Sequence, residues 1–212
     1  MINVLVIGSG DLGKQIAHYI SSSPEYKMVG YIDDWKEIGN QMGDYPILGH
    51  MDDIEHLYKE QKFDKLLIGI GYKHFDTRKS IFERFSGKIP FASYVHPSTY
   101  VDSTAKIGNG VIILPKCVID MQSIIQDNVF IYSGSVVGHN SIIGFNSIIS
   151  LSVTTGGFAN IGSSCFIGLG TNVQDHIKIV DNSFVGSASN VIKDINKSGV
   201  YVGNPAKLLK LI

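Results

Sequence analysis

The sequence has little charge, few prolines and almost no cysteine. Lys and Arg number 18 against 19 Asp and Glu, so a net charge of −1 offers no basic surface for nucleic acid or an anionic membrane. Two cysteines in 212 residues exclude a disulfide scaffold. No apolar run has the length of a bilayer span, and Met1 leads directly into a strand-like segment. We therefore expect a soluble, cytoplasmic protein.

What the sequence does contain is 23 glycines among many Ile and Val residues, arranged with a period of six. Every sixth position from Val101 to Val191 is Ile or Val, with the single exception of Thr155. The position four residues further on in each hexad, from Ala105 to Ser189, is mostly small and never charged. The repeat has no insertion.

A six-residue period fits neither an α-helix nor an amphipathic strand. It predicts a short strand followed by a tight corner, with three such units closing one coil and the aliphatic residue pointing inward. Residues 101–190 would then form five coils of 18 residues. Each coil stacks on the next at about 4.8 Å and relies on its neighbours to bury its aliphatic side chains.

One column of predicted corners is marked by glycine and asparagine. Gly and Asn tolerate the left-handed backbone of a tight turn. This column therefore predicts a structural edge of the prism. Its members, 18 residues apart, are Gly110, Asn128, Asn146, Ser164 and Asn182.

A second column lacks a Gly/Asn ladder, and a corner that departs from the turn rule is a candidate functional site. Its members are Ser103, Met121, His139, Gly157 and Asp175, followed by Thr104, Gln122, Asn140, Phe158 and His176. The imidazole of His139 can accept a proton from an attacking amine. Gly157, one coil above, offers a bare backbone N–H to a developing oxyanion. This pair predicts acyl transfer.

The first 95 residues predict a small α/β domain. Buried strands are expected at 4–7, 28–32 and 65–70, each followed by a helical pattern. The order strand–helix–strand–helix–strand–helix is typical of a parallel sheet with covering helices.

A glycine-rich loop, Gly8-x-Gly10-x-x-Gly13, lies between the first strand and the first helix, where backbone amides and the helix dipole favour an anion. Asp33 follows Gly13 by 20 residues, as in a dinucleotide fingerprint. An NAD-dependent dehydrogenase is nevertheless disfavoured, because the segment holds only half of a doubly wound nucleotide domain.

Together these features resemble the hexapeptide-repeat, left-handed parallel β-helix acyltransferases. The arrangement is similar to the nucleotide-sugar N-acetyltransferases that acetylate a 4-amino sugar for bacterial surface polysaccharides, and the likeness extends to the closing residues 202–207. It implies a Rossmann-like half domain at 1–95 that binds the nucleotide sugar. It further implies a left-handed β-helix with a C-terminal tail at 96–212, acetyl-CoA as co-substrate, no metal, and a homotrimer with the active site between subunits.

The resemblance also assigns site residues. The catalytic residues would be His139, Gly157 and Asn140, which stands where the family usually has Asp or Glu. The nucleotide sugar would contact Gly8, Gly10, Gly13, Asp33, Asp34, Gly71 and Tyr72. Acetyl-CoA would contact Gly157, Leu169, His176 and Ser187.

We therefore expect an acetyl-CoA-dependent N-acetyltransferase that acts on the amine of a UDP- or dTDP-linked 4-amino-deoxy sugar, with His139 as general base. The alternatives are a sugar O-acetyltransferase, a transferase of another acyl group, and a non-enzymatic nucleotide-binding β-helix protein. The sequence does not distinguish UDP from dTDP, nor does it identify the sugar epimer or the glycan.

Overall fold

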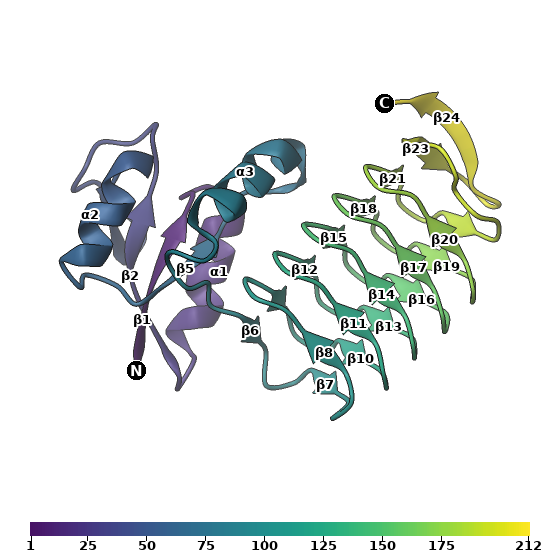
Figure 1. Ribbon diagram of the computed structural model, residues 1–212, viewed down its shortest axis with the longest axis horizontal. Helices are drawn as coiled ribbons and strands as arrows, with labels where there is room; N and C mark the ends of the chain where they lie inside the picture. The colour runs from purple at the N-terminus through teal and green to yellow at the C-terminus, as the bar shows by residue number, and fades with distance from the viewer. The chain divides into compact units, whose positions relative to one another are not determined.

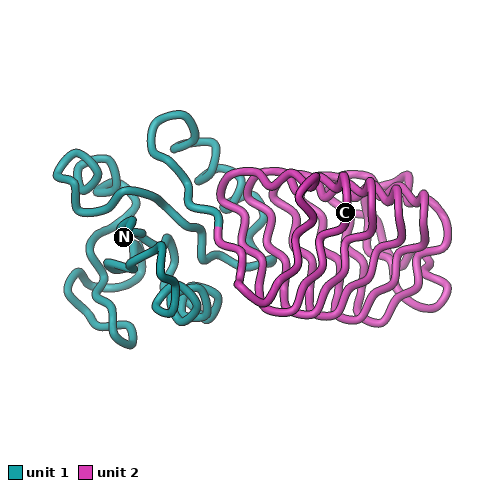
Figure 2. Tube along the Cα trace, turned by 90° about the horizontal axis from the view of Figure 1, so that it is seen from below, with its two compact units in different colours: residues 1–93 teal, residues 94–212 magenta.

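A computed structural model describes all 212 residues, which form two compact units, Met1–Ser93 and Tyr94–Ile212 (Figure 2). The sequence pattern placed the boundary after residue 95. The structure places it earlier because Tyr94 and Val95 already pair with Ile112 and Ile113 of the first coil.

The first unit is a five-stranded sheet with three α-helices. Its elements are β1 (Ile2–Ile7), α1 (Asp11–Ser21), β2 (Tyr26–Ile32), β3 (Gln41–Met42), β4 (Tyr45–Gly49), α2 (Ile54–Lys59), β5 (Lys65–Ile68) and α3 (Phe75–Phe85). The strand order is β3-β4-β2-β1-β5, parallel except for β3 (Figure 1). The continuous apolar run of β1 is buried, as expected for the middle of a parallel sheet. None of the helices has the length and apolar composition that crossing a membrane requires.

The sequence pattern predicted only three strands in this unit. It missed β4 and its short antiparallel partner β3. The segment Tyr45–Gly49 contains Pro46 and lies beside β2 near the edge of the sheet, where a proline is tolerated but weakens the strand signal. The third predicted strand ends at Ile68, because Gly69 turns away while its N–H still donates to the Ile7 carbonyl.

The second unit is a parallel β-helix with three faces (Figure 1). One face consists of β7 (Tyr100–Val101), β10 (Val118–Ile119), β13 (Val136–Val137), β16 (Thr154–Thr155), β19 (Asn172–Val173) and β22 (Asn190–Val191). The next consists of β8 (Lys106–Ile107), β11 (Ile124–Ile125), β14 (Ile142–Ile143), β17 (Asn160–Ile161) and β20 (Lys178–Ile179). The third consists of β6 (Tyr94–Val95), β9 (Ile112–Ile113), β12 (Phe130–Ile131), β15 (Ile148–Ile149), β18 (Phe166–Ile167), β21 (Phe184–Val185), β23 (Gly199–Val202) and the antiparallel β24 (Lys207–Leu211).

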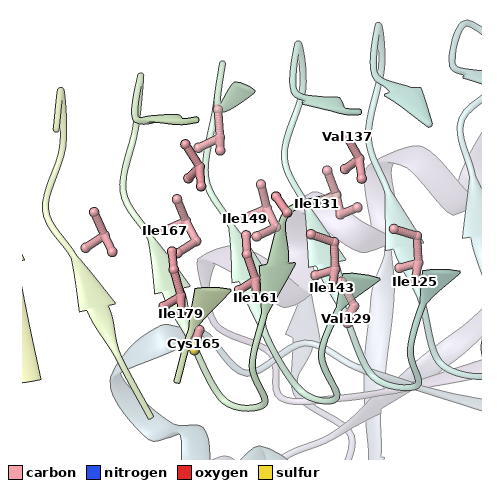
Figure 3. Packing of buried hydrophobic residues seen from close by; sticks show 14 of the residues in the cluster. Ile125, Val129, Ile131, Val137, Ile143, Ile149, Ile161, Cys165, Ile167 and Ile179 are labelled. Carbon is pink, nitrogen blue, oxygen red and sulfur yellow. The ribbon is translucent and has the colours of Figure 1, made fainter. Parts of the chain in front are cut away.

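Neighbouring strands within a coil face pair residues 18 apart, as Val118 pairs with Val136 and Ile124 with Ile142. The predicted coil of three hexads is therefore confirmed. The aliphatic residue of each hexad points into the coil, where Ile125, Ile143 and Ile161 follow one another along the axis (Figure 3). Each such side chain contributes about 1.5–3 kcal/mol by leaving water.

The corners share one backbone conformation. The fourth residue of each hexad has a positive φ, from Gly110 (69°) through Asn146 (61°) to Ala188 (55°). On the predicted Gly/Asn edge the side chains also form a buried ladder, in which Asn128 Nδ2 donates to Asn146 Oδ1 (2.8 Å) and Asn146 Nδ2 to Ser164 Oγ (3.0 Å). The predicted structural edge is present.

The edge that carries His139 makes the same left-handed turn. This corrects the expectation that its corners depart from the rule. Only the residue types differ, because Gln122 (56°), Phe158 (57°) and His176 (61°) adopt a backbone that ordinarily favours Gly or Asn.

Lys116 offers a direct test of this corner geometry. It is exposed and has φ 61°, so Lys116→Gly should raise the free energy of unfolding by about 1 kcal/mol, because glycine adopts this backbone without strain. Lys106→Gly is the control: it changes an exposed residue within β8, and glycine there should lower the free energy of unfolding by about 0.5–1 kcal/mol. Denaturant unfolding of both variants measures the difference, and equal effects would contradict the proposed strain.

Candidate active site

The glycine loop and the predicted acidic residues meet at one edge of the first unit. Ile7, the last residue of β1, pairs with Ile32 of β2 and with Ile68 of β5. Because the strands are parallel, the segments that begin at Gly8, Asp33 and Gly69 all leave the same edge of the sheet. The structure thus brings together the predicted nucleotide-sugar residues, including Gly71 and Tyr72.

The four glycines of this edge divide into two kinds. Gly8 has φ 94°, and a Cβ on Gly13 would lie 1.9 Å from the Gly8 carbonyl oxygen, so the tight turn itself requires both. Gly10 and Gly71 have no such constraint: no atom lies within 4 Å of a Cβ built on either. They are the N-cap residues of α1 and of the short turn Tyr72–His74, so both leave open space beside helical N–H groups.

The predicted carboxylates already have partners within the chain. Asp33 Oδ2 accepts hydrogen bonds from the backbone N–H (3.0 Å) and the hydroxyl of Ser9, and Asp33 Oδ1 accepts one from Trp35 N (3.0 Å). Burial raises the pKa of Asp33, but these hydrogen bonds outweigh it and lower the pKa below its ordinary value. Asp34 Oδ1 accepts from Met51 N (2.7 Å). These carboxylates therefore shape the loops at this edge and keep their remaining lone pairs for a ligand.

Two further residues support this edge, and neither stood out in the sequence. Ser9 is buried and joins the glycine loop to Asp33. Arg78, on α3, is 1% exposed and donates from Nη1 to the carbonyl of Ile70 (2.7 Å), just before Gly71. An arginine on the apolar face of a predicted helix was the available signal for this second contact.

On the β-helix, His139 and Gly157 lie directly above one another. They follow β13 and β16, which pair in register. A Cβ built on Gly157 would lie 2.5 Å from His139 Nε2 and 2.6 Å from its Cε1, so the position of the ring leaves room only for glycine. The predicted proximity of the imidazole and the bare peptide is therefore present in the structure.

The amide of Gly157 is available for a ligand. At the same corner position two coils below, the N–H of Met121 donates to Asp120 Oδ1 (2.7 Å). The N–H of Gly157 donates to no group of the chain, whereas the following amide, Phe158 N, donates to the His139 carbonyl (2.9 Å). A free N–H beside an imidazole is the arrangement that stabilises an oxyanion next to a base.

Thr155, the exception in the hexad series, acquires an explanation here. It is 3% exposed, and its hydroxyl accepts a hydrogen bond from Gly138 N (3.1 Å). This bond supports the backbone immediately before His139. An aliphatic residue at this position would leave the Gly138 amide without that partner.

The remaining residues of this edge form a continuous row. His139 Nδ1 lies 3.0 Å from Asn140 Oδ1. Phe158 makes an edge contact with the His139 ring, with centroids 5.2 Å apart and planes at 86°. His176 stacks on Phe158 at 4.8 Å and 5°. The structure thus joins His139, Asn140, Gly157 and His176, through a phenylalanine that had not been assigned a role.

Leu169 and Ser187 do not lie on this edge. They follow β18 and β21, so they stack on the edge at the other side of the face formed by β13, β16 and β19. Leu169 is 50% exposed. Within one chain, the predicted acetyl-CoA contacts therefore flank a face of the prism rather than surrounding His139.

No group of three or more His, Cys, Asp or Glu side chains is arranged to hold a metal ion. The chemistry available at the His139 edge is that of a general base beside an N–H donor. This combination is suited to attack on a carbonyl carbon, in which a proton leaves the nucleophile while negative charge develops on oxygen.

Both units match known families. Residues 3–85 match the PglD N-terminal domain, and residues 90–201, more than half of the chain, match the GMPPB C-terminal domain. No curated protein sequence gives a match.

Solved structures are similar over the whole chain. The acetyltransferase domain of PglB from Neisseria gonorrhoeae, in complex with acetyl coenzyme A, has a TM-score of 0.89 and 25% sequence identity, with 98% of each chain covered. PerB from Caulobacter crescentus, in complex with CoA and GDP-perosamine, has a TM-score of 0.87 and 23% identity, with 97% of this chain and 96% of that chain covered.

The fold is thus the left-handed parallel β-helix preceded by an α/β unit, as the sequence resemblance implied. The chain belongs to the nucleotide-sugar N-acetyltransferases of the hexapeptide-repeat acyltransferase family.

Proposed function

We propose that this protein transfers the acetyl group of acetyl-CoA to the amine of a nucleotide-linked 4-amino-deoxy sugar, with His139 as general base. The observation that carries the proposal is the position of His139 Nε2 against Gly157, whose N–H has no partner within the chain. The likeness to an acetyltransferase domain described in complex with acetyl coenzyme A supports the choice of donor.

In this mechanism the neutral amine of the sugar attacks the carbonyl carbon of the thioester. His139 Nε2 accepts the proton that the amine loses, while the N–H of Gly157 donates to the oxyanion of the tetrahedral intermediate. The intermediate then collapses, the C–S bond breaks, and the proton on Nε2 passes to the departing thiolate. The products are the N-acetyl sugar and CoA. No nucleophilic side chain adjoins His139, so transfer is direct.

Asn140 orients the ring in this scheme. With Oδ1 facing His139 Nδ1 at 3.0 Å, it accepts the Nδ1–H hydrogen bond and leaves Nε2 as the basic nitrogen. Unlike the carboxylate usual in the family, the amide adds no charge to stabilise the imidazolium.

The nucleotide diphosphate is proposed to bind at the open glycines of the first unit. Gly10 and Gly71 present helical N–H groups with no side chain in front of them, which favours an anion. Gly8, Gly13, Asp33 and Asp34 hold the loops that frame this position, and Tyr72 lies exposed beside Gly71. We propose UDP or dTDP as the nucleotide, and GDP is a necessary comparison because the Caulobacter relative is described with GDP-perosamine.

The donor is proposed to contact Gly157 and His176 on one edge, and Leu169 and Ser187 on the other. Because these two edges flank a face of the prism, a second copy of the chain would complete the acetyl-CoA site, as expected for a homotrimer. The reaction is proposed to take place in the cytoplasm, where acetyl-CoA is available.

His139→Ala should lower turnover by roughly 10²–10⁴-fold, the contribution of a positioned general base, and leave the affinity for acetyl-CoA unchanged. Release of free CoA measures turnover, and calorimetry measures donor binding. His56→Ala is the control, because His56 is exposed on α2 and pairs only with Glu60. A folded His139→Ala protein with near-normal turnover would exclude this residue as the base.

Gly157→Ala should lower turnover roughly 100-fold, because its methyl group must displace the imidazole from its position. The thermal unfolding midpoint should change little, because the ring is exposed and can move outward. Ser163→Ala, at the equivalent corner position on the next edge of the same coil, should retain wild-type turnover. Full activity of Gly157→Ala would show that the ring and the glycine do not act together.

Trp35 provides a test of the nucleotide site. It is the only tryptophan, is 93% exposed, and donates its backbone N–H to Asp33. Binding of UDP, dTDP or GDP should therefore change its fluorescence, and the tightest of the three identifies the base. Gly10→Leu should abolish the response by filling the open space beside α1. An unchanged emission at millimolar nucleotide, or an equal response from Gly10→Leu, would place the nucleotide elsewhere.

A further inference from the structure

The carboxamide of Gln122 lies one coil below Asn140 and hydrogen-bonds to it. Asn140 Nδ2 donates to Gln122 Oε1 at 2.6 Å, while Asn140 Oδ1 faces His139 Nδ1 at 3.0 Å. We infer that Gln122 is a positioning residue for the reaction, which selects the orientation of the Asn140 amide and thereby the protonated nitrogen of His139. This inference rests on the proposed role of His139 as general base.

The orientation of an asparagine amide matters here because its two ends have opposite hydrogen-bonding character. With Oδ1 toward the ring, His139 carries its proton on Nδ1, and Nε2 has the free lone pair. If the amide is rotated by 180°, Nδ2 donates to Nδ1, and the proton of a neutral ring resides on Nε2. A ring in that tautomer cannot accept a proton at the nitrogen that faces Gly157.

The two ends of the amide have nearly the same shape, so packing does not choose between them. A neighbouring acceptor does choose, because it pairs with Nδ2 and repels Oδ1. Gln122 Oε1 is that acceptor. In enzymes with Asp or Glu at position 140 the question would not arise, because a carboxylate presents an acceptor in either orientation.

The coil register places Gln122 where it can do this. Gln122 and Asn140 are 18 residues apart, share the left-handed corner backbone (φ 56° and 57°), and are joined by a bond from Asn140 N to Met121 O (2.9 Å). From below, Thr104 Oγ1 accepts the N–H of Gln122 (2.8 Å) and is itself bonded to Asp102 Oδ1 (2.7 Å). The backbone of Gln122 is thereby fixed although its side chain is exposed.

Gln122→Met removes the acceptor at nearly constant size. One hydrogen bond of ordinary strength fixes the preference, so turnover should fall about three- to tenfold while KM for both substrates stays unchanged. Gln122→Glu should retain wild-type turnover, because a carboxylate at this position can only accept. Gln126→Met is the matched control: Gln126 Oε1 accepts a backbone N–H from Phe145 at a different edge and should leave turnover unaffected.

The decisive comparison uses Asn140→Asp. A carboxylate has no orientation to select, so Gln122→Met should have no effect on turnover in the Asn140→Asp background. A loss of the same size in both backgrounds would mean that Gln122 acts only on the structure of the edge and would overturn the inference.

The ring can also be observed without substrate. In protein labelled with ¹⁵N-histidine, at a pH where the imidazoles are neutral, two-bond ¹H–¹⁵N correlations distinguish the tautomers, and the His139→Ala spectrum identifies the signals of His139. The wild type and Gln122→Glu should show the Nδ1–H form, and Gln122→Met should show a mixture. A pure Nδ1–H form in Gln122→Met would overturn the inference.

The two proposals fail in different ways. If His139→Ala keeps its turnover, the base assignment fails regardless of the tautomer. If His139→Ala is inactive while Gln122→Met keeps both turnover and tautomer, only the role of Gln122 fails.

Discussion

The parallel backbone ladder between coils is the constraint on which the rest of the structure depends. Each strand of the β-helix is only two residues long, so no strand has stability of its own. Hydrogen bonds to the coils above and below hold residues 18 apart in register, and this register also stacks the buried Ile and Val side chains. The same ladder brings His139 against Gly157, so the packing of the core and the geometry of the site have one cause.

The repeat made much of the second unit predictable. A period of six with aliphatic and small positions determines which residues point inward, and the arithmetic of 18 identifies which corners stack. The contact between His139 and Gly157 follows from that arithmetic. The hydrogen bond between Asn140 and Gln122 does not, because it depends on side-chain torsions that spacing does not specify. The hydroxyl contact of Thr155 could have been sought, since a break in a strict repeat is a local signal.

The first unit was less predictable because it has no repeat. Its glycine loop and its central strands were evident from composition, but β4 was not, because Pro46 and the shortness of the segment conceal a strand at the margin of the sheet. The sequence also gave no indication that Asp33 binds Ser9, a contact between segments 24 residues apart. Carboxylates that had been regarded as ligand contacts therefore have a second task in holding the loops.

The unbroken coil register limits how a chain of this kind can change in length. Loss or gain of one residue inside a strand would exchange inward and outward side chains, and a change of six would carry all later residues to a neighbouring face. Only the duplication or deletion of a complete turn preserves every face. Even such a turn would be harmful between positions 139 and 157, where an additional layer would separate the imidazole from the peptide nitrogen, whereas near the C-terminal end it would only lengthen the prism. Modular growth is therefore open to this protein everywhere except within the one layer that performs its chemistry.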